Sequence, residues 1–81
     1  MAFCWEDQLG RKHQGAAQLA NISPSGASVE VQSPVRIGTK LLLDYQNQEL
    51  CGKVKYCVLQ RSGYRLGIEF QDGNRWSPRR S

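Results

Sequence analysis

Apolar and polar residues alternate with a period of two along several short segments of the chain, and this pattern limits the fold more than any other feature. In one such segment Ala27, Val29 and Val31 share a face, while Ser28 and Glu30 lie on the other. This period is typical of a half-buried β-strand, because successive side chains of a strand point to opposite faces of its sheet. No segment shows helical periodicity, apart from a possible turn near the C-terminus.

Turn-forming residues separate these segments and divide the chain into six predicted strands. The predicted strands cover residues 3–6, 12–22, 27–32, 40–45, 50–58 and 64–70. In the fifth strand the pattern places Leu50, Gly52, Val54, Tyr56 and Val58 on one face, with Lys53 and Lys55 on the other. Short antiparallel strands bury one face most simply by closing into a barrel, which also removes exposed edges. We therefore predict an all-β fold, a small six-stranded antiparallel β-barrel.

The length of the chain, 81 residues, allows a single domain, because a domain ordinarily needs about 50 residues or more. We expect the barrel over residues 1–70 and a basic tail over residues 71–81. Of the 11 Lys and Arg residues, which outnumber 7 Asp and Glu, three stand in the tail: Arg75, Arg79 and Arg80. A nucleic-acid-binding barrel more typically spreads its basic residues over one folded face. The high isoelectric point is therefore weak support for nucleic-acid binding.

Neither the apolar runs nor the N-terminus of the sequence favours a membrane or an exported protein. The apolar runs are too short to cross a bilayer, and Glu6 and Asp7 stand where a signal peptide needs apolar residues. The cysteines, Cys4, Cys51 and Cys57, are odd in number and form no C-x-x-C pair. This number and spacing of cysteines favours reduced thiols in a cytoplasmic protein over a disulfide or zinc framework.

The sequence contains no set of residues typical of a catalytic or metal site. Its only histidine is His13, and nothing in the sequence places this residue beside a cysteine. No paired acid and base and no zinc-ligand spacing are recognisable. We predict a protein that is not an enzyme and needs no cofactor.

The most specific stretch of the chain is Asn21-Ile22-Ser23-Pro24-Ser25-Gly26. One interpretation is purely structural: Ser, Pro and Gly at the first, second and fourth positions favour a type I turn. Gly26 can then adopt the left-handed conformation of a bulge that follows the turn. On this interpretation Asn21 only ends a strand.

In its context the stretch resembles the signature of the PilZ domain family. Asn-x-Ser-x-x-Gly leads into an alternating strand, Gly-Arg-Lys-His-x-Gly precedes it, and Tyr-Arg-Leu-Gly-Ile-Glu-Phe ends the resemblance at Phe70. PilZ domains are β-barrels that bind the bacterial second messenger cyclic di-GMP. The resemblance implies that Asn21, Ser23 and Gly26 form a ligand-binding element on the barrel surface, where polar groups face guanine edges and the glycine leaves room for the ligand.

The family's second element, Arg-x-x-x-Arg on an arm ahead of the first strand, has no counterpart at that place in this sequence. We expect the arm to be missing, and three other basic stretches are candidate substitutes: Arg11-Lys12-His13, Arg61 to Arg65, and Arg75 to Arg79. We interpret the first as a solvated turn and the second as a coincidence across a hairpin tip, while the third would have to fold back over the barrel. The arginines matter because a guanidinium binds phosphate through two parallel hydrogen bonds and stacks on purines.

Three functional hypotheses follow. The leading one is a cytoplasmic receptor or adaptor that binds cyclic di-GMP non-covalently and acts through a protein partner. The alternative is a degenerate PilZ-like barrel that serves as a protein–protein interaction module without nucleotide binding. The third is a small nucleic-acid-binding barrel that uses the Arg-rich tail, which strong salt dependence would reveal. None of the three involves a membrane.

Overall fold

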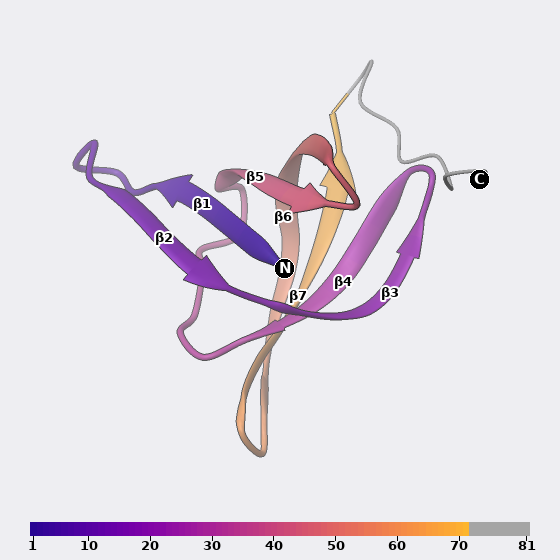
Figure 1. Cartoon of the computed structure of the whole chain (residues 1–81). Coiled ribbons are helices and arrows are strands. Elements are labelled where there is room, and N and C mark those ends of the chain that lie inside the picture. Colours follow the sequence, from indigo (N-terminus) through magenta and orange to yellow (C-terminus); the bar gives the residue numbers. More distant parts are fainter. Residues whose placement is uncertain (72–81) are drawn as a thin grey trace.

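The computed structural model describes residues 1–71, and their regular structure consists of antiparallel β-strands (Figure 1). The strands are β1 (Ala2–Glu6), β2 (Lys12–Ala16), β3 (Gln18–Ser23), β4 (Gly26–Val31), β5 (Lys40–Tyr45), β6 (Gln48–Gln60) and β7 (Gly63–Phe70). They form one sheet in the order β2-β1-β5-β6-β7-β4-β3, which curls into a half-barrel. The predicted all-β, barrel-like fold is confirmed. The described part of the chain contains no helix that is long and apolar enough to cross a membrane.

Seven strands form instead of the six predicted, because the segment expected as one strand divides at Ala17. The first half, β2, pairs with β1, and the second half, β3, pairs with β4, so the halves lie at opposite edges of the sheet. Two backbone hydrogen bonds fix Ala17: its amide donates to the Met1 carbonyl (2.8 Å), and its carbonyl accepts from the N-terminal ammonium (2.7 Å). One bent segment of chain thus supplies both edges of the half-barrel, as the path of β2 into β3 shows in Figure 1.

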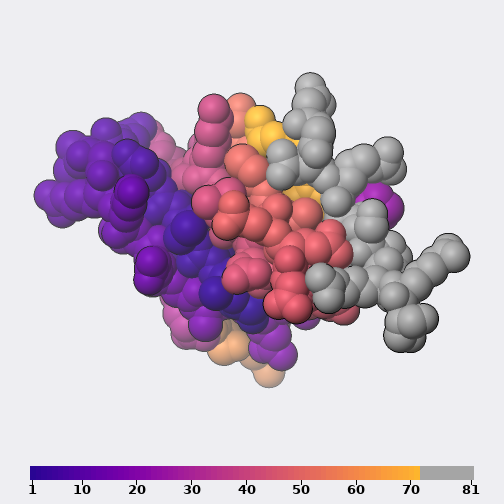
Figure 2. Space-filling view, turned by 45° about the horizontal axis from the view of Figure 1, so that its top comes forward, coloured from indigo at the N-terminus to yellow at the C-terminus, as the bar shows by residue number. Residues whose placement is uncertain are grey.

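The inner face of the curled sheet carries the apolar core, and the alternation seen in the sequence is confirmed for most strands. In β4, Val29 and Val31 are buried and Ala27 packs against them; in β7, Leu66 and Ile68 are buried. The buried residues are Phe3, Ala17, Val29, Val31, Val35, Leu41, Leu43, Leu50, Val54, Leu66, Ile68 and Phe70. In the space-filling view, the indigo and purple atoms of the first strands lie against the pink and red atoms of β5 and β6 (Figure 2).

The alternation predicted for the long strand β6 holds only as far as Val54. The register between β6 and β7 shifts between Val54 and Tyr56, so Lys55 is an extra residue in β6. An extra residue reverses which side chains face inward, because the side-chain period of a strand is two. Beyond the bulge Cys57 packs against the core, while Tyr56 (43% exposed) and Val58 (49% exposed) lie on the outer face. The prediction that Tyr56 and Val58 share a face with Val54 is therefore wrong.

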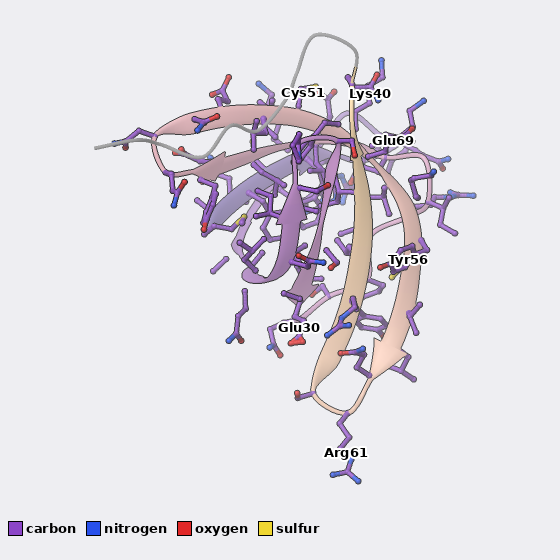
Figure 3. The ribbon with its side chains drawn as sticks, turned by 90° about the vertical axis from the view of Figure 1, so that its right-hand side faces the viewer. Glu30, Lys40, Cys51, Tyr56, Arg61 and Glu69 are labelled. Carbon is purple, nitrogen blue, oxygen red and sulfur yellow. The ribbon has the colours of Figure 1, made fainter. Side chains whose placement is uncertain are left out.

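Beyond this bulge the β6–β7 hairpin extends past the rest of the half-barrel, with Arg61 at its tip (Figure 3). Leu59 of this hairpin is 72% exposed. The basic pattern from Arg61 to Arg65 thus spans the tip, as expected, and its two arginines lie in different surroundings. Arg61 points away from the body of the molecule, whereas the Arg65 guanidinium lies 3.5 Å from a carboxylate oxygen of Glu30.

The turn between β1 and β2 is organised by the carboxylate of Asp7. Its Oδ1 accepts hydrogen bonds from the backbone amides of Leu9 and Arg11, both at 2.9 Å, and its Oδ2 lies 2.9 Å from Nε2 of His13. The His13 ring stacks on Trp5, with ring centroids 4.9 Å apart. The hydrogen bond from His13, followed by those from the backbone, lowers the pKa of Asp7. The stretch 11–13 is therefore part of a bonded turn rather than only a solvated one.

A glycine in place of Gln46 is expected to stabilise the fold. The hairpin between β5 and β6 has Gln46 (φ 51°) and Asn47 (φ 60°) at its two central positions. A left-handed conformation costs an ordinary L-residue about 1–2 kcal/mol. Glycine does not have this cost, but its greater conformational freedom in the unfolded chain offsets part of the gain in stability. We expect Gln46→Gly to raise the free energy of unfolding by about 0.5–1 kcal/mol in urea titrations. Asn47→Gly should gain less, because asparagine tolerates this conformation. An unchanged or lower stability of Gln46→Gly would contradict the assigned turn.

Asp7 is expected to make the stability of the protein depend on acid pH. Because its folded pKa lies below the unfolded one, its contribution is present above about pH 4, the ordinary pKa of aspartic acid, and is lost as the pH falls through the folded pKa. Asp7→Asn keeps an oxygen acceptor for the backbone amides but removes the charge. In thermal unfolding, Asp7→Asn should melt below the parent protein at neutral pH, and the two curves should converge near pH 2. A difference in melting temperature that stays the same at acid pH would count against this role of Asp7. An equal decrease in melting temperature for Glu6→Gln would also count against it.

Candidate functional site

The predicted motif forms the β3–β4 hairpin at one edge of the sheet. Pro24 and Ser25 make the turn, and Ser23 pairs with Gly26 across it. Oγ of Ser23 donates a hydrogen bond to the Gly26 carbonyl (3.3 Å) and lies 3.5 Å from Oγ of Ser25. Asn21 lies within β3, beyond a register irregularity after Leu19, and is exposed. The motif therefore lies on the surface, and Asn21 does not simply end a strand.

Gly26 is required by the close approach of two strands. A Cβ atom at this position would lie 2.5 Å from the carbonyl oxygen of Ile68 in β7. Positive φ angles occur among the described glycines at Gly10, Gly38 and Gly63, and Gly26 is not among them. The prediction of a left-handed Gly26 is therefore wrong. A side chain here would displace β7 before it reached any ligand.

A row of residues crosses the outer surface from the motif to β6. Asn21 pairs with Ser28 of β4, Ser28 with Gly67 of β7, and Gly67 with Tyr56 of β6. The Tyr56 ring occupies the space that a side chain at position 67 would fill. Aromatic coverage of a strand glycine in this way holds the ring in a defined position. The three pairings place an amide, a hydroxyl and an aromatic ring in one row on the same face.

These residues line a surface pocket of about 230 Å³. Its walls include all three residues predicted from the motif, Asn21, Ser23 and Gly26, and also Lys55 and Tyr56 of β6. The pocket is open and polar on the side of the hairpin. In chemical terms it offers amide and hydroxyl hydrogen-bonding groups on one wall and an aromatic ring with a cation on the other.

The cation at the edge of this pocket is Lys55, the bulged residue of β6. Its Nζ lies 3.2 Å from Oε2 of Glu69, and both side chains are 60% exposed. Exposed ion pairs of this kind contribute only about 0.2–1 kcal/mol, so an anion can compete for the ammonium group at little cost. Lys53, which pairs with Glu69 in the register, is likewise exposed.

The basic stretches considered as substitutes for the arginine element contribute no residue to the lining of this pocket or lie outside the described residues. Arg11 is exposed in the β1–β2 turn, and Arg61 is at the hairpin tip. Arg65 is on the outer face next to the Tyr56 row but is paired with Glu30. The stretch from Arg75 to Arg79 lies outside the described residues.

Sequence reasoning missed Tyr56, Ser28 and Gly67 as members of this surface. Tyr56 was assigned to the inner face because the bulge at Lys55 was not recognised. One signal was available: a glycine inside a strand often marks a bulge or a close approach by another group. Gly67 stands in such a position.

No second centre of chemistry is evident in the part of the chain that the structure describes. Residues 1–71 contain no cluster of three or more His, Cys, Asp and Glu side chains that could hold a metal. The three cysteines form no disulfide with one another and are partly buried. His13 contacts Asp7 and Trp5.

Comparisons with known proteins agree with the fold and the motif. The family model of the PilZ domain matches residues 7–77. No curated protein and no solved structure shows significant similarity to the chain. The matched region covers strands β2 to β7 and the whole β3–β4 hairpin. PilZ domains are ligand-binding domains rather than enzymes. The chain belongs to the PilZ domain family.

Proposed function

We propose that this protein is a cytoplasmic, bacterial receptor or adaptor that binds cyclic di-GMP at the pocket between the β3–β4 hairpin and β6, and that it does so without catalysis. The observation that carries the proposal is the convergence of Asn21, Ser23 and Gly26 with Tyr56 in one surface pocket. Three of these belong to the family signature, and the fourth supplies an aromatic surface that the signature does not specify.

The chemistry of the pocket suits a guanine base. The Asn21 amide offers both a donor and an acceptor to a base edge, and the hydroxyls of Ser23 and Ser28 offer further hydrogen bonds. The exposed face of Tyr56 provides a stacking surface, and such stacking contributes about 1–3 kcal/mol per base. Lys55 supplies a positive charge for a phosphate. The pocket thus offers partners for the base and for the phosphate of one guanylate unit.

The size of the pocket indicates that it holds one base rather than the whole ligand. Its volume of about 230 Å³ is below the roughly 300–1,000 Å³ of pockets that enclose drug-sized ligands. The remainder of cyclic di-GMP would lie over the surface. A further basic segment that closes over it would raise affinity, and ordering of that segment would create or mask a surface for a protein partner.

Calorimetric titration with cyclic di-GMP tests the hydrogen-bonding wall. We expect binding by the parent protein and a two- to tenfold weaker affinity for Asn21→Ala, because a neutral hydrogen bond contributes about 0.5–1.5 kcal/mol. Gln18→Ala, in the same strand but outside the pocket, is the matched control and should bind like the parent. Absence of heat from the parent at high micromolar ligand would contradict the proposal and leave the interaction-module alternative.

Tyr56 variants test the stacking wall separately. Tyr56→Ala should weaken binding roughly 5- to 100-fold, which corresponds to the stacking contribution of one base. Tyr56→Phe keeps the ring and should restore most of the affinity. Val58→Ala, on the same face but outside the pocket, controls for disturbance of β6. Equal affinities of Tyr56→Ala and the parent, with both proteins folded in thermal melts, would exclude stacking on this ring.

A further inference from the structure

The outer side of β5 carries three kinds of residue in sequence order. Lys40, Leu42 and Asp44 point outward, whereas Leu41 (2% exposed) and Leu43 (1% exposed) are buried beneath them. A cation, an apolar group and an anion therefore follow one another along a single strand. The apolar residue Leu42 is 36% exposed between the two charges.

Strand β6 repeats the same order, whereas β1 repeats only the apolar position, with Ala2 opposite Asp44. On β6, Lys53 pairs with Lys40, Cys51 with Leu42, and Glu49 with Asp44. On β1, Cys4 pairs with Leu42. The result is a basic row, an apolar row and an acidic row across the sheet, which we call the β5 face: Lys40, Lys53, Cys4, Leu42, Cys51, Asp44 and Glu49. Lys40 and Cys51 are labelled at the upper end of the sheet in Figure 3.

The hollows on the β5 face coincide with its acidic and basic ends. Two hollows, of about 490 and 470 Å³, lie on either side of Leu42 and Cys4, which line both. Asp44 and Glu49 line the first hollow, and Lys12 and Lys40 line the second, together with Glu6. Leu42 and Cys4, together with Gln14, therefore separate an acidic hollow from a predominantly basic one.

We propose that the β5 face is the interface of a symmetric dimer of this protein. A two-fold axis that lies between two such faces and runs across the strands turns β5 antiparallel to its copy. Leu42 then meets Leu42 of the partner subunit, and Lys40 meets Asp44 of the partner subunit. Lys53 likewise meets Glu49 of the partner subunit. Each charge pair occurs twice because the interface is self-complementary.

The distribution of charge on the β5 face favours a second copy of this chain as the partner, related by the axis that runs across the strands. A two-fold axis parallel to β5 would place Lys40 against Lys40 and Asp44 against Asp44 of the partner subunit, so like charges would meet along β5. A polyanion such as a nucleic acid would be attracted by the basic row and repelled by the acidic row. A second copy in the antiparallel arrangement satisfies both rows at once.

The dimer is expected to be weak. Three neighbouring strands, β1, β5 and β6, carry the face, and at about 4.8 Å between strands and 3.4 Å per residue it measures roughly 14 by 17 Å. This is below the roughly 800 Å² per partner of a standard interface, so association should be concentration-dependent in the micromolar range. It does not depend on the ligand pocket, which lies around Asn21 on the β3–β4 side of the sheet.

Sedimentation equilibrium on the 81-residue chain tests the dimer and its axis. We expect Lys40→Glu or Asp44→Lys to weaken dimerisation about tenfold or more, since either change replaces two attractive pairs by repulsive ones. The double variant Lys40→Glu/Asp44→Lys exchanges the charges and should dimerise like the parent. Arg61→Glu, an equal change of charge at the hairpin tip, should have no effect. Leu42→Glu should be monomeric and should still show a cooperative thermal unfolding transition, as a folded protein does.

Cross-linking gives an independent test of the axis. In the antiparallel arrangement Cys4 faces Cys4 of the partner subunit, so a variant that keeps only Cys4 (Cys51→Ser/Cys57→Ser) should form covalent dimers with a short bismaleimide. The excluded axis places Cys4 opposite Cys51 of the partner subunit. Cross-links that require both cysteines, a monomeric parent at several hundred micromolar, or failure of the charge exchange to restore the dimer would each overturn the proposal.

Discussion

The bend at Ala17, which two hydrogen bonds to Met1 hold, carries the chain from one edge of the sheet to the other. At this bend β2 leaves β1 and the chain crosses to β4 as β3. Because one continuous segment supplies both edges, the sheet has to curl, and curling gives it an inner face for the core. The same bend positions the β3–β4 hairpin at the edge beside β4, where its polar residues remain accessible.

The fold class was predictable because alternation survives wherever strands pair regularly. β4 and β7 are examples: Val29 and Leu66 are buried as their positions predict. The division at Ala17 and the bulge at Lys55 were not predictable, since each depends on pairing with strands distant in the sequence. The residues around Lys55 carry no signal of the bulge, since the indicative glycine, Gly67, stands in the paired strand, and every assignment beyond the bulge is reversed.

The same reasoning explains what was predictable about the candidate site. Asn21, Ser23 and Gly26 are close in sequence, so their proximity follows from a hairpin alone. Tyr56 reaches the pocket only through two intermediate strands, by way of Ser28 and Gly67. The conformational interpretation of Gly26 failed for a related reason. The atom that excludes a side chain there belongs to Ile68, more than half the chain away.

β6 connects the two surfaces of this protein because its residues contribute to both. Before the bulge its outward side chains, Glu49, Cys51 and Lys53, belong to the β5 face, and after it Tyr56 belongs to the pocket. Lys55 lies at the boundary and is paired with Glu69. An anionic ligand that draws Lys55 away leaves Glu69 facing Lys53, its neighbour in the register. The bulge at Lys55 thus separates the side chains that β6 gives to the β5 face from those that it gives to the pocket.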